Sequence, residues 1–234
     1  MNATTYNPST KLASIRPGTN WGEVFTALNK YNVSTVGGRA SVVGVGGFTT
    51  GGGYSFHSNS RGFACDNVAN FEVVLADGSV VNANAHENPD LWKSLKGASG
   101  NFGFVTRIDE CTSFSSRIPH KRFVRLTSLP DIVESNLMWG GFLNFDLGER
   151  DAVFQAYLNF ADNMDTDPAS QLIVSFQYNG KERVLLSVMS NIDAVEMAPA
   201  FDEFRTIKNT SSTLSTGLIA DLVPQFTGPT PLGL

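Results

Sequence analysis

The sequence feature that most constrains this chain of 234 residues is a glycine-dense segment from Gly37 to Gly53. Eight of its seventeen residues are glycine, although the whole chain has only 22 glycines. Glycine lacks a Cβ atom and tolerates positive φ, so backbone amides in such a segment can approach a ligand closely. Successive exposed N–H groups form a concave anion site that suits a pyrophosphate. The segment therefore predicts a phosphate-binding loop, and the alternative is a tightly turned loop or close packing of backbone on backbone.

Two common phosphate-binding patterns do not fit this segment. In the dinucleotide fingerprint G-x-G-x-x-G, Gly44 and Gly46 match, but Thr49 occupies the third glycine position. The Walker pattern also fails, because no lysine follows the glycines. The sequence therefore disfavours a nicotinamide-binding Rossmann domain and a nucleoside triphosphatase.

Composition excludes several other classes of protein. Hydrophobic residues make up 41% of the chain and charged residues 17%, which is typical of a globular protein. A net charge of −5 gives no reason to expect nucleic acid as a partner, and no apolar run is long enough for a membrane span. The three histidines are too scattered to indicate a metal site. The sequence also lacks the Gly-x-Ser-x-Gly pattern of hydrolases.

Two cysteines and three glycosylation sequons bear on the environment of the protein. Cys65 and Cys111 could form one disulfide or stay as free thiols, and the sequence leaves both readings open. The sequons at Asn2, Asn32 and Asn209 weakly favour a secretory setting.

Local patterns predict the secondary structure. Apolar residues at helical spacing predict a helix over 20–28, capped by Thr19 or Asn20, and Asp77-Gly78 predicts a β-hairpin over 71–82. Further predicted elements are a strand over 11–16, a helix over 88–96, a strand over 101–109, a helix over 151–160, a hairpin over 171–189, a helix over 200–207 and a loop over 227–234. Glycine thins out near residue 115, which predicts a boundary between domains at 1–114 and 115–234.

Several motifs follow one another in a fixed order over about a hundred residues. They are the segments 15–21, 36–54, 62–68, 72–78, 88–92 and 97–106. Together they resemble the vanillyl-alcohol oxidase/PCMH-type flavoproteins, and within these the berberine bridge enzyme-like branch. Residues 115–234 resemble the start of that family's substrate domain more loosely.

The resemblance implies an α+β fold, in which a PCMH-type FAD-binding domain, incomplete at its N-terminus, precedes the start of a substrate domain. It implies an oxidase that transfers a hydride from a small alcohol, amine, sugar or alkaloid to FAD and then to oxygen. No catalytic base can be named. The alternative is a truncated, non-catalytic FAD-binding fragment of such an enzyme.

The resemblance also assigns cofactor contacts residue by residue. The Gly-Gly-Arg and glycine-loop positions that would lie along FAD are Gly37, Gly38, Arg39, Ser41, Gly44, Gly46, Gly47 and Gly51. The later motifs contribute Asp66, Asn67, Val68, Gly103 and Val105. For Asp66 and Asn67 a turn that hydrogen-bonds its own backbone is nearly as good an interpretation. His57 could approach the flavin, but a solvated loop histidine is the favoured interpretation.

The chain departs from the family pattern at two places. Many members link FAD through a cysteine, and Ala40 stands at that position, so no cysteinyl bond is expected. Met1 aligns with an interior segment of the family, just past an upstream flavin-binding loop. We therefore expect a fragment or an internally started gene model, whose full-length form is secreted and has neither nucleic-acid nor membrane partners.

Overall fold

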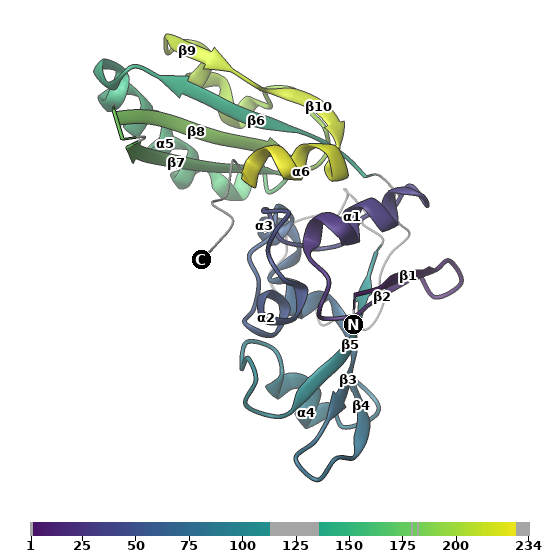
Figure 1. The fold of residues 1–234 in the computed structure, drawn as a ribbon. Helices are drawn as coiled ribbons and strands as arrows, with labels where there is room; N and C mark the ends of the chain where they lie inside the picture. Colours follow the sequence, from purple (N-terminus) through teal and green to yellow (C-terminus); the bar gives the residue numbers. More distant parts are fainter. Residues whose placement is uncertain (1, 113–135, 179, 182, 228–234) are drawn as a thin grey trace.

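The computed structural model describes residues 2–112, 136–178, 180–181 and 183–227, which form two antiparallel sheets (Figure 1). The first sheet has the strand order β1-β2-β5-β3-β4. The second has the order β10-β6-β8-β7, and β9 also pairs with β6. We call the first sheet with helices α1 to α4 the first body, and the second sheet with helix α5 the second body. The predicted α+β class is confirmed, whereas the boundary predicted at residue 115 lies outside the described residues.

The strands of the first sheet follow the local patterns closely. They are β1 (Thr4–Asn7), β2 (Leu12–Ile15), β3 (Val68–Val74), β4 (Val80–Asn84) and β5 (Phe104–Cys111). The predicted Asp77-Gly78 turn joins β3 to β4, with Val74 opposite Val80. Gly78 has φ +84°, a conformation that glycine adopts without strain.

Helix α1 (Trp21–Asn29) begins at the predicted cap, Asn20. The Asn20 side chain accepts a hydrogen bond from Glu23 N–H at 2.9 Å, and the Glu23 carboxylate accepts one from Asn20 N–H at 3.2 Å. Such a capping box contributes roughly 1 kcal/mol to the stability of a helix. It fixes the point at which α1 starts, and therefore the position of Trp21.

Three further helices of the first body are short. They are α2 (Val45–Thr50), α3 (Ser58–Arg61) and α4 (Pro89–Ser94), with a 3₁₀ turn, η1, at Ala64–Asn67. The predicted helix over 88–96 corresponds to α4. Helix α2 lies inside the glycine-dense segment and has no counterpart among the sequence predictions, because glycine disfavours helices.

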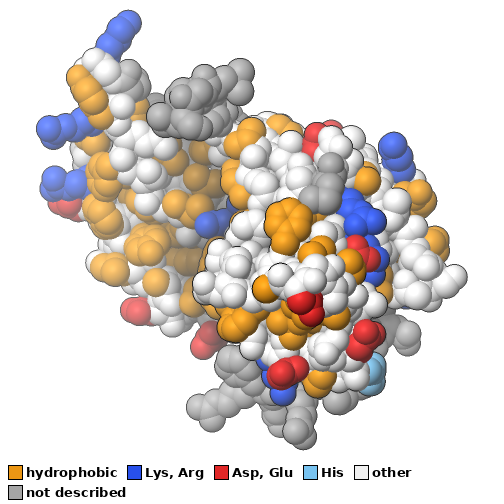
Figure 2. Space-filling view, turned by 60° about the horizontal axis from the view of Figure 1, so that its bottom comes forward, with side chains coloured by type: hydrophobic (Ala, Val, Ile, Leu, Met, Phe, Trp, Pro, Cys, Tyr) orange, Lys and Arg blue, Asp and Glu red, His pale blue; other side chains and the backbone are white. Residues whose placement is uncertain are grey.

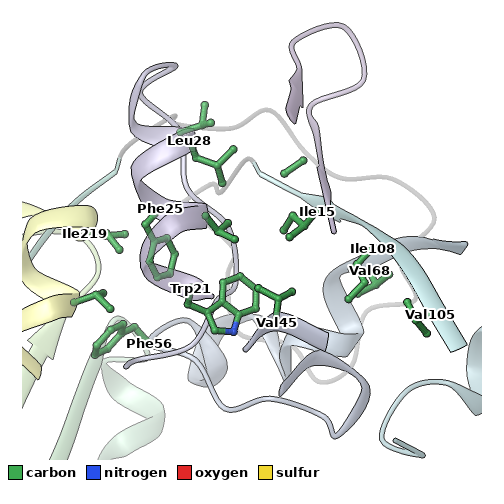
Figure 3. Packing of buried hydrophobic residues seen from close by; sticks show 14 of the residues in the cluster. Ile15, Trp21, Phe25, Leu28, Val45, Phe56, Val68, Val105, Ile108 and Ile219 are labelled. Carbon is green, nitrogen blue, oxygen red and sulfur yellow. The ribbon is translucent and has the colours of Figure 1, made fainter. Parts of the chain in front are cut away.

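The core of the first body is built around α1 (Figure 3). Trp21, Phe25 and Leu28 of α1 belong to this core together with the sheet residues Ile15 and Ile108 (Figure 3). Ile219 joins this core from α6 (Ile219–Thr227), the last described helix. Helix α6 packs against both α1 and β6, so residues from the two ends of the chain share one core.

The second body has longer strands and its own apolar core. Its strands are β6 (Leu137–Phe145), β7 (Ser170–Tyr178), β8 (Arg183–Asn191), β9 (Asn209–Ser212) and β10 (Ser215–Leu218). Its helical elements are α5 (Arg150–Asp162), η2 (Leu147–Glu149), η3 (Met164–Thr166) and η4 (Pro199–Arg205). Phe160 of α5 stacks on Phe201 of η4 with ring centroids 5.5 Å apart, and Phe201 in turn packs on Trp139 of β6, with centroids 5.7 Å apart.

The sequence predictions for the second body are confirmed in part. The helix over 151–160 and the hairpin over 171–189 are present as α5 and as β7 with β8. The predicted helix over 200–207 is wrong in type, because η4 is a 3₁₀ helix of seven residues that begins at Pro199. The loop predicted over 227–234 lies outside the described residues except for Thr227, which ends α6.

Neither cysteine forms a disulfide, because Cys65 and Cys111 are both free thiols. Burial raises the pKa of the Cys65 thiol to about 11, with Asp66 adding to the effect. Within the part of the chain that the structure describes, no helix has the length and apolar character needed to cross a bilayer.

Glu110 on β5 is fully buried, and this predicts a pH dependence of stability. Burial raises the pKa of its carboxyl well above the usual value of 4.5. Above pH 4.5 the unfolded chain loses this proton while the folded protein keeps it. The contribution of Glu110 to stability therefore falls as pH rises, by up to about 1.4 kcal/mol per pH unit, while buried His57, whose pKa is lowered to about 3, contributes in the opposite direction below pH 6.5.

The substitution Glu110→Gln should remove this fall. Measured by urea unfolding, the stability of the variant relative to the native chain should therefore rise between pH 5 and pH 6, by up to about 1 kcal/mol, because both proteins keep the His57 contribution. The exposed Glu87→Gln is the matched control and should keep the native slope. Equal slopes in native chain and Glu110→Gln would contradict the prediction.

Candidate functional site

The glycine-dense segment is attached to the N-terminus of α1. Trp21 N–H donates to Val43 O at 3.1 Å, Gly22 N–H to Ser41 O at 2.9 Å, and Val45 N–H to Thr19 O at 2.9 Å. These backbone bonds hold the segment against the start of the helix that carries Trp21. The position of the candidate site therefore depends on α1.

The far end of the segment joins two of the other motifs. Ala64 N–H donates to Gly53 O at 2.9 Å and Cys65 N–H to Gly52 O at 3.0 Å. Ser99 N–H donates to Thr50 O at 3.0 Å. The structure thus brings the glycine-dense segment together with the motifs at 62–68 and 97–106.

Three of the predicted site glycines are explained by packing. A Cβ atom on Gly37 would lie 2.6 Å from Trp21 Cζ3, and one on Gly38 would lie 2.5 Å from Trp21 Cδ1. A Cβ atom on Gly46 would lie 2.9 Å from Pro17 Cβ. The alternative reading of the segment, backbone packed closely on neighbouring groups, therefore accounts for these three positions.

Gly44 and Gly47 are different, because packing does not require them. Both are exposed, and a Cβ atom added to either would meet no atom within 4 Å. Gly44 has φ −70°, which any residue can adopt. These two positions leave an open strip of backbone at the start of α2.

Amide groups of this strip are available to a ligand. The first N–H groups of a helix have no partner within the helix. In α2, Val45 N–H and Gly46 N–H donate to Thr19 O and Pro17 O of the preceding chain. Among the described residues, none accepts a hydrogen bond from Gly47 N–H. This exposed amide has the geometry that close approach of an anionic group requires.

The last predicted glycine, Gly51, ends helix α2. A Cβ atom there would lie 2.9 Å from Gly47 O, so the close approach is to the helix itself. The next two residues, Gly52 and Gly53, have φ +109° and +80° and turn the chain toward Cys65. This turn is a structural use of glycine.

Ser41 has a partner that sequence reasoning missed. Its N–H donates to Thr227 Oγ1 at 2.8 Å, and the two hydroxyl oxygens are 3.0 Å apart. Thr227 ends α6 and is 186 residues away along the chain, so no local pattern could have indicated the contact. The Ser41 amide is therefore held by the chain's own last described helix.

Arg39 lies with its guanidinium carbon 4.7 Å from the centre of the Tyr54 ring. Burial lowers the pKa of Arg39 from its usual value, and Tyr54 acts in the opposite direction. The residue lines a cavity shared with β7 and α5. Of the predicted cofactor residues, it is the one that the structure places beside the second body.

Asp66 and Asn67 serve their own loop. Asp66 Oδ2 accepts a hydrogen bond from Phe63 N–H at 2.9 Å. Asn67 Nδ2 donates to Arg61 O at 3.1 Å and to Phe63 O at 2.9 Å. These contacts correspond to the turn that was the alternative interpretation of the pair.

The remaining predicted residues are set into the sheet and core. Val68 is buried, and its carbonyl oxygen accepts a hydrogen bond from Trp92 Nε1 at 3.0 Å. Gly103 has φ +144°, and a Cβ atom there would lie 2.7 Å from Val73 Cγ1. Val105 belongs to the core cluster around Trp21. The side chains of Val68 and Val105 are therefore used in the core of the first body.

His57 is buried rather than solvated, so the interpretation favoured from the sequence is wrong. Its side chain is 6% exposed. Burial lowers its pKa to about 3, and the positive charge of Arg61 adds to the effect. The imidazole is therefore neutral near pH 7. A single sequence gives no signal that separates a buried loop histidine from a solvated one.

No group of three or more potential metal ligands occurs among the residues that the structure describes. Residues 1–84 match the family model described as "FAD binding domain". The family model thus covers the whole glycine-dense segment, including the open strip at Gly44 and Gly47.

Two curated fungal relatives match almost the entire chain. The FAD-dependent monooxygenase drtC of Aspergillus calidoustus is 36% identical over 228 residues, which cover 97% of this chain and 40% of that protein. The FAD-dependent monooxygenase sdcF of Emericella nidulans is 35% identical over 232 residues, which cover 98% of this chain and 44% of that protein. The chain thus spans less than half the length of these relatives.

A solved structure shows that both bodies share a known fold. The crystal structure of 6-hydroxy-D-nicotine oxidase from Arthrobacter nicotinovorans matches 99% of this chain and 48% of that chain, with a TM-score of 0.79 and 19% identity. The sequence and structural matches together confirm the resemblance drawn from the motifs. Residues 1–84 thus belong to the FAD-binding domain family, and the chain as a whole is similar to the vanillyl-alcohol oxidase-type flavoproteins.

Proposed function

We propose that this protein acts as an FAD-dependent oxidase of the berberine bridge enzyme-like branch. In this proposal a small alcohol, amine, sugar or alkaloid gives a hydride to FAD, and oxygen is the final electron acceptor. The observation that carries the proposal is the open backbone at Gly44 and Gly47, inside the segment that matches an FAD-binding domain. The names of the two curated relatives as FAD-dependent enzymes also support it.

The residues of this chain would act on FAD mainly through their backbone. FAD supplies the redox chemistry when it is bound, and the protein supplies position and environment. Gly47 N–H would donate to the diphosphate, and the absence of side chains at Gly44 and Gly47 would allow the close approach. Gly37 and Gly38 would affect FAD binding indirectly, because they pack on the Trp21 ring and so position the glycine-dense segment.

Further predicted contacts with FAD would come from residues outside the glycine-dense segment. The backbone of Asp66, Val68, Gly103 and Val105 would line the cofactor beyond the glycine-dense segment. Ala40 has no nucleophilic atom, so we expect no covalent bond between this residue and the flavin. His57 would not carry the second proton of an imidazolium ion near pH 7 and would not act as a cationic acid.

A flavin titration tests the proposal. The 234-residue chain and the complete open reading frame should each quench FAD fluorescence at micromolar concentration. The complete reading frame should also form hydrogen peroxide with one of the candidate substrates. FAD binding without peroxide by either protein would support the alternative, a non-catalytic FAD-binding chain. Failure of both proteins to bind micromolar FAD would contradict the proposed function.

A further inference from the structure

A cavity of about 270 Å³ lies between the two bodies, apart from the open strip at Gly44 and Gly47. Arg39, Tyr54 and Asn59 line it from the first body, and Phe160 and Ile173 are among the residues that line it from the second. Figure 2 shows the surface hollowed between the two bodies, with hydrophobic and basic side chains in the hollow. The cavity therefore has walls from both parts of the chain.

Two hydrogen bonds between the bodies hold the polar side of this cavity in place. Asn59 Nδ2 donates to Ser170 O at 3.1 Å, and Gln171 Nε2 donates to Ser55 O at 2.9 Å. Tyr54 OH donates to Asn59 Oδ1 at 3.2 Å. These contacts fix Asn59, Gln171 and Tyr54, so the cavity is lined by side chains with few alternative positions.

Arg39 is the one charged residue among the described residues that line the cavity. It forms no ion pair with any described carboxylate, and it rests instead on the Tyr54 ring. A partly buried guanidinium without a carboxylate partner is costly, and it presents a planar fork of donors that suits a carboxylate. The cavity therefore favours an anionic group at Arg39.

Gln171 provides a second polar feature. The residue is 4% exposed, and its Oε1 atom is buried without a hydrogen-bond partner among the described residues. Buried polar atoms in folded proteins normally have such a partner. Because this oxygen itself has almost no accessible surface, the polar lining groups that a ligand hydroxyl can reach are Tyr54 OH and the Asn59 amide.

The rest of the lining is apolar and sets the size of the ligand. Phe160, Met164, Leu172 and Ile173 contribute hydrophobic surface. A cavity of roughly 150 Å³ holds one benzene molecule, so 270 Å³ suits a single ring with a carboxylate and a hydroxyl group.

We propose that this cavity is a binding site for a small hydroxylated ring carboxylate, whose acid group is bound by Arg39. The proposal goes beyond the proposed function, because it needs neither FAD nor turnover. It assigns Arg39 to a ligand other than the flavin diphosphate.

Matched acid and amide probes test the proposal in solution. Isothermal titration of the 234-residue chain should show that 3- or 4-hydroxybenzoate binds at least tenfold more tightly than the corresponding hydroxybenzamide. In Arg39→Gln this preference should fall below threefold, because the uncharged glutamine side chain cannot distinguish the acid from the benzamide by charge. Arg150→Gln is the matched control, since Arg150 is exposed and pairs with Asp151 at 2.9 Å. It should keep the tenfold preference.

Three results would overturn the proposal. The first is the absence of binding of both acids at millimolar concentration by a folded chain, as judged by circular dichroism. The second is an acid preference that Arg39→Gln leaves unchanged. The third is loss of acid binding on addition of saturating FAD, which would place the cavity within the flavin site. Because the first two measurements contain no FAD, failure of the proposed function would not affect them.

Discussion

Replacing Trp21 by alanine should lower the free energy of unfolding by about 3 to 5 kcal/mol, the usual cost of removing a buried tryptophan. The side chain is fully buried. Its ring lies 5.9 Å from that of Phe25 and 5.3 Å from that of Phe48, between centroids. Gly37 and Gly38 pack directly on it, so its removal would also leave the start of the glycine-dense segment without support. Urea unfolding monitored by circular dichroism measures the loss.

Two companion variants show whether this loss comes from the packing described. Trp21→Phe keeps a ring at the same place and should lose less than Trp21→Ala. Gly38→Ala keeps the tryptophan but introduces the Cβ clash, and overpacking of this kind costs about 1 to 3 kcal/mol. A loss below about 1 kcal/mol for Trp21→Ala would show that Trp21 does not organise this core.

The substitution Gly47→Ala should change stability and FAD affinity in opposite senses. Alanine is favoured over glycine inside a helix by about 1 kcal/mol, and a Cβ atom at this position meets nothing within 4 Å. The free energy of unfolding should therefore stay constant or rise. In the proposed site the same methyl group would meet the flavin diphosphate, so the dissociation constant for FAD should rise at least tenfold.

The matched control for Gly47→Ala is Gly217→Ala in the second sheet. A Cβ atom at Gly217 would be in ordinary contact with Leu222 Cγ at 3.4 Å, far along the chain from the glycine-dense segment. This control should leave FAD affinity unchanged, as measured by fluorescence titration. Native FAD affinity in a stable Gly47→Ala variant would show that the open strip does not bind the cofactor.

Sequence-based prediction of the fold was most successful where the signal is local. The helical spacing of Trp21, Phe25 and Leu28 predicted α1, and the Asp77-Gly78 turn predicted the hairpin of β3 and β4. Both patterns arise from contacts or torsion angles within a few residues. The ordered motifs over about a hundred residues also sufficed to identify the family.

The uses of the individual glycines could not be predicted in this way. The sequence treats Gly37 and Gly47 alike, yet one packs on Trp21 and the other is open to solvent. The difference depends on which atoms lie next to each backbone position after folding. The burial of His57 was missed for the same reason.

By itself, the sequence determined the family, the main local elements and a backbone able to bind a phosphate, because these depend on residue types at fixed short spacings. Only the tertiary structure decided which part of that backbone is open. It also decided that Thr227 bonds to Ser41, and that Arg39 and Gln171 line one cavity. These features join residues more than a hundred positions apart, and their contacts exist only once the two bodies have packed together.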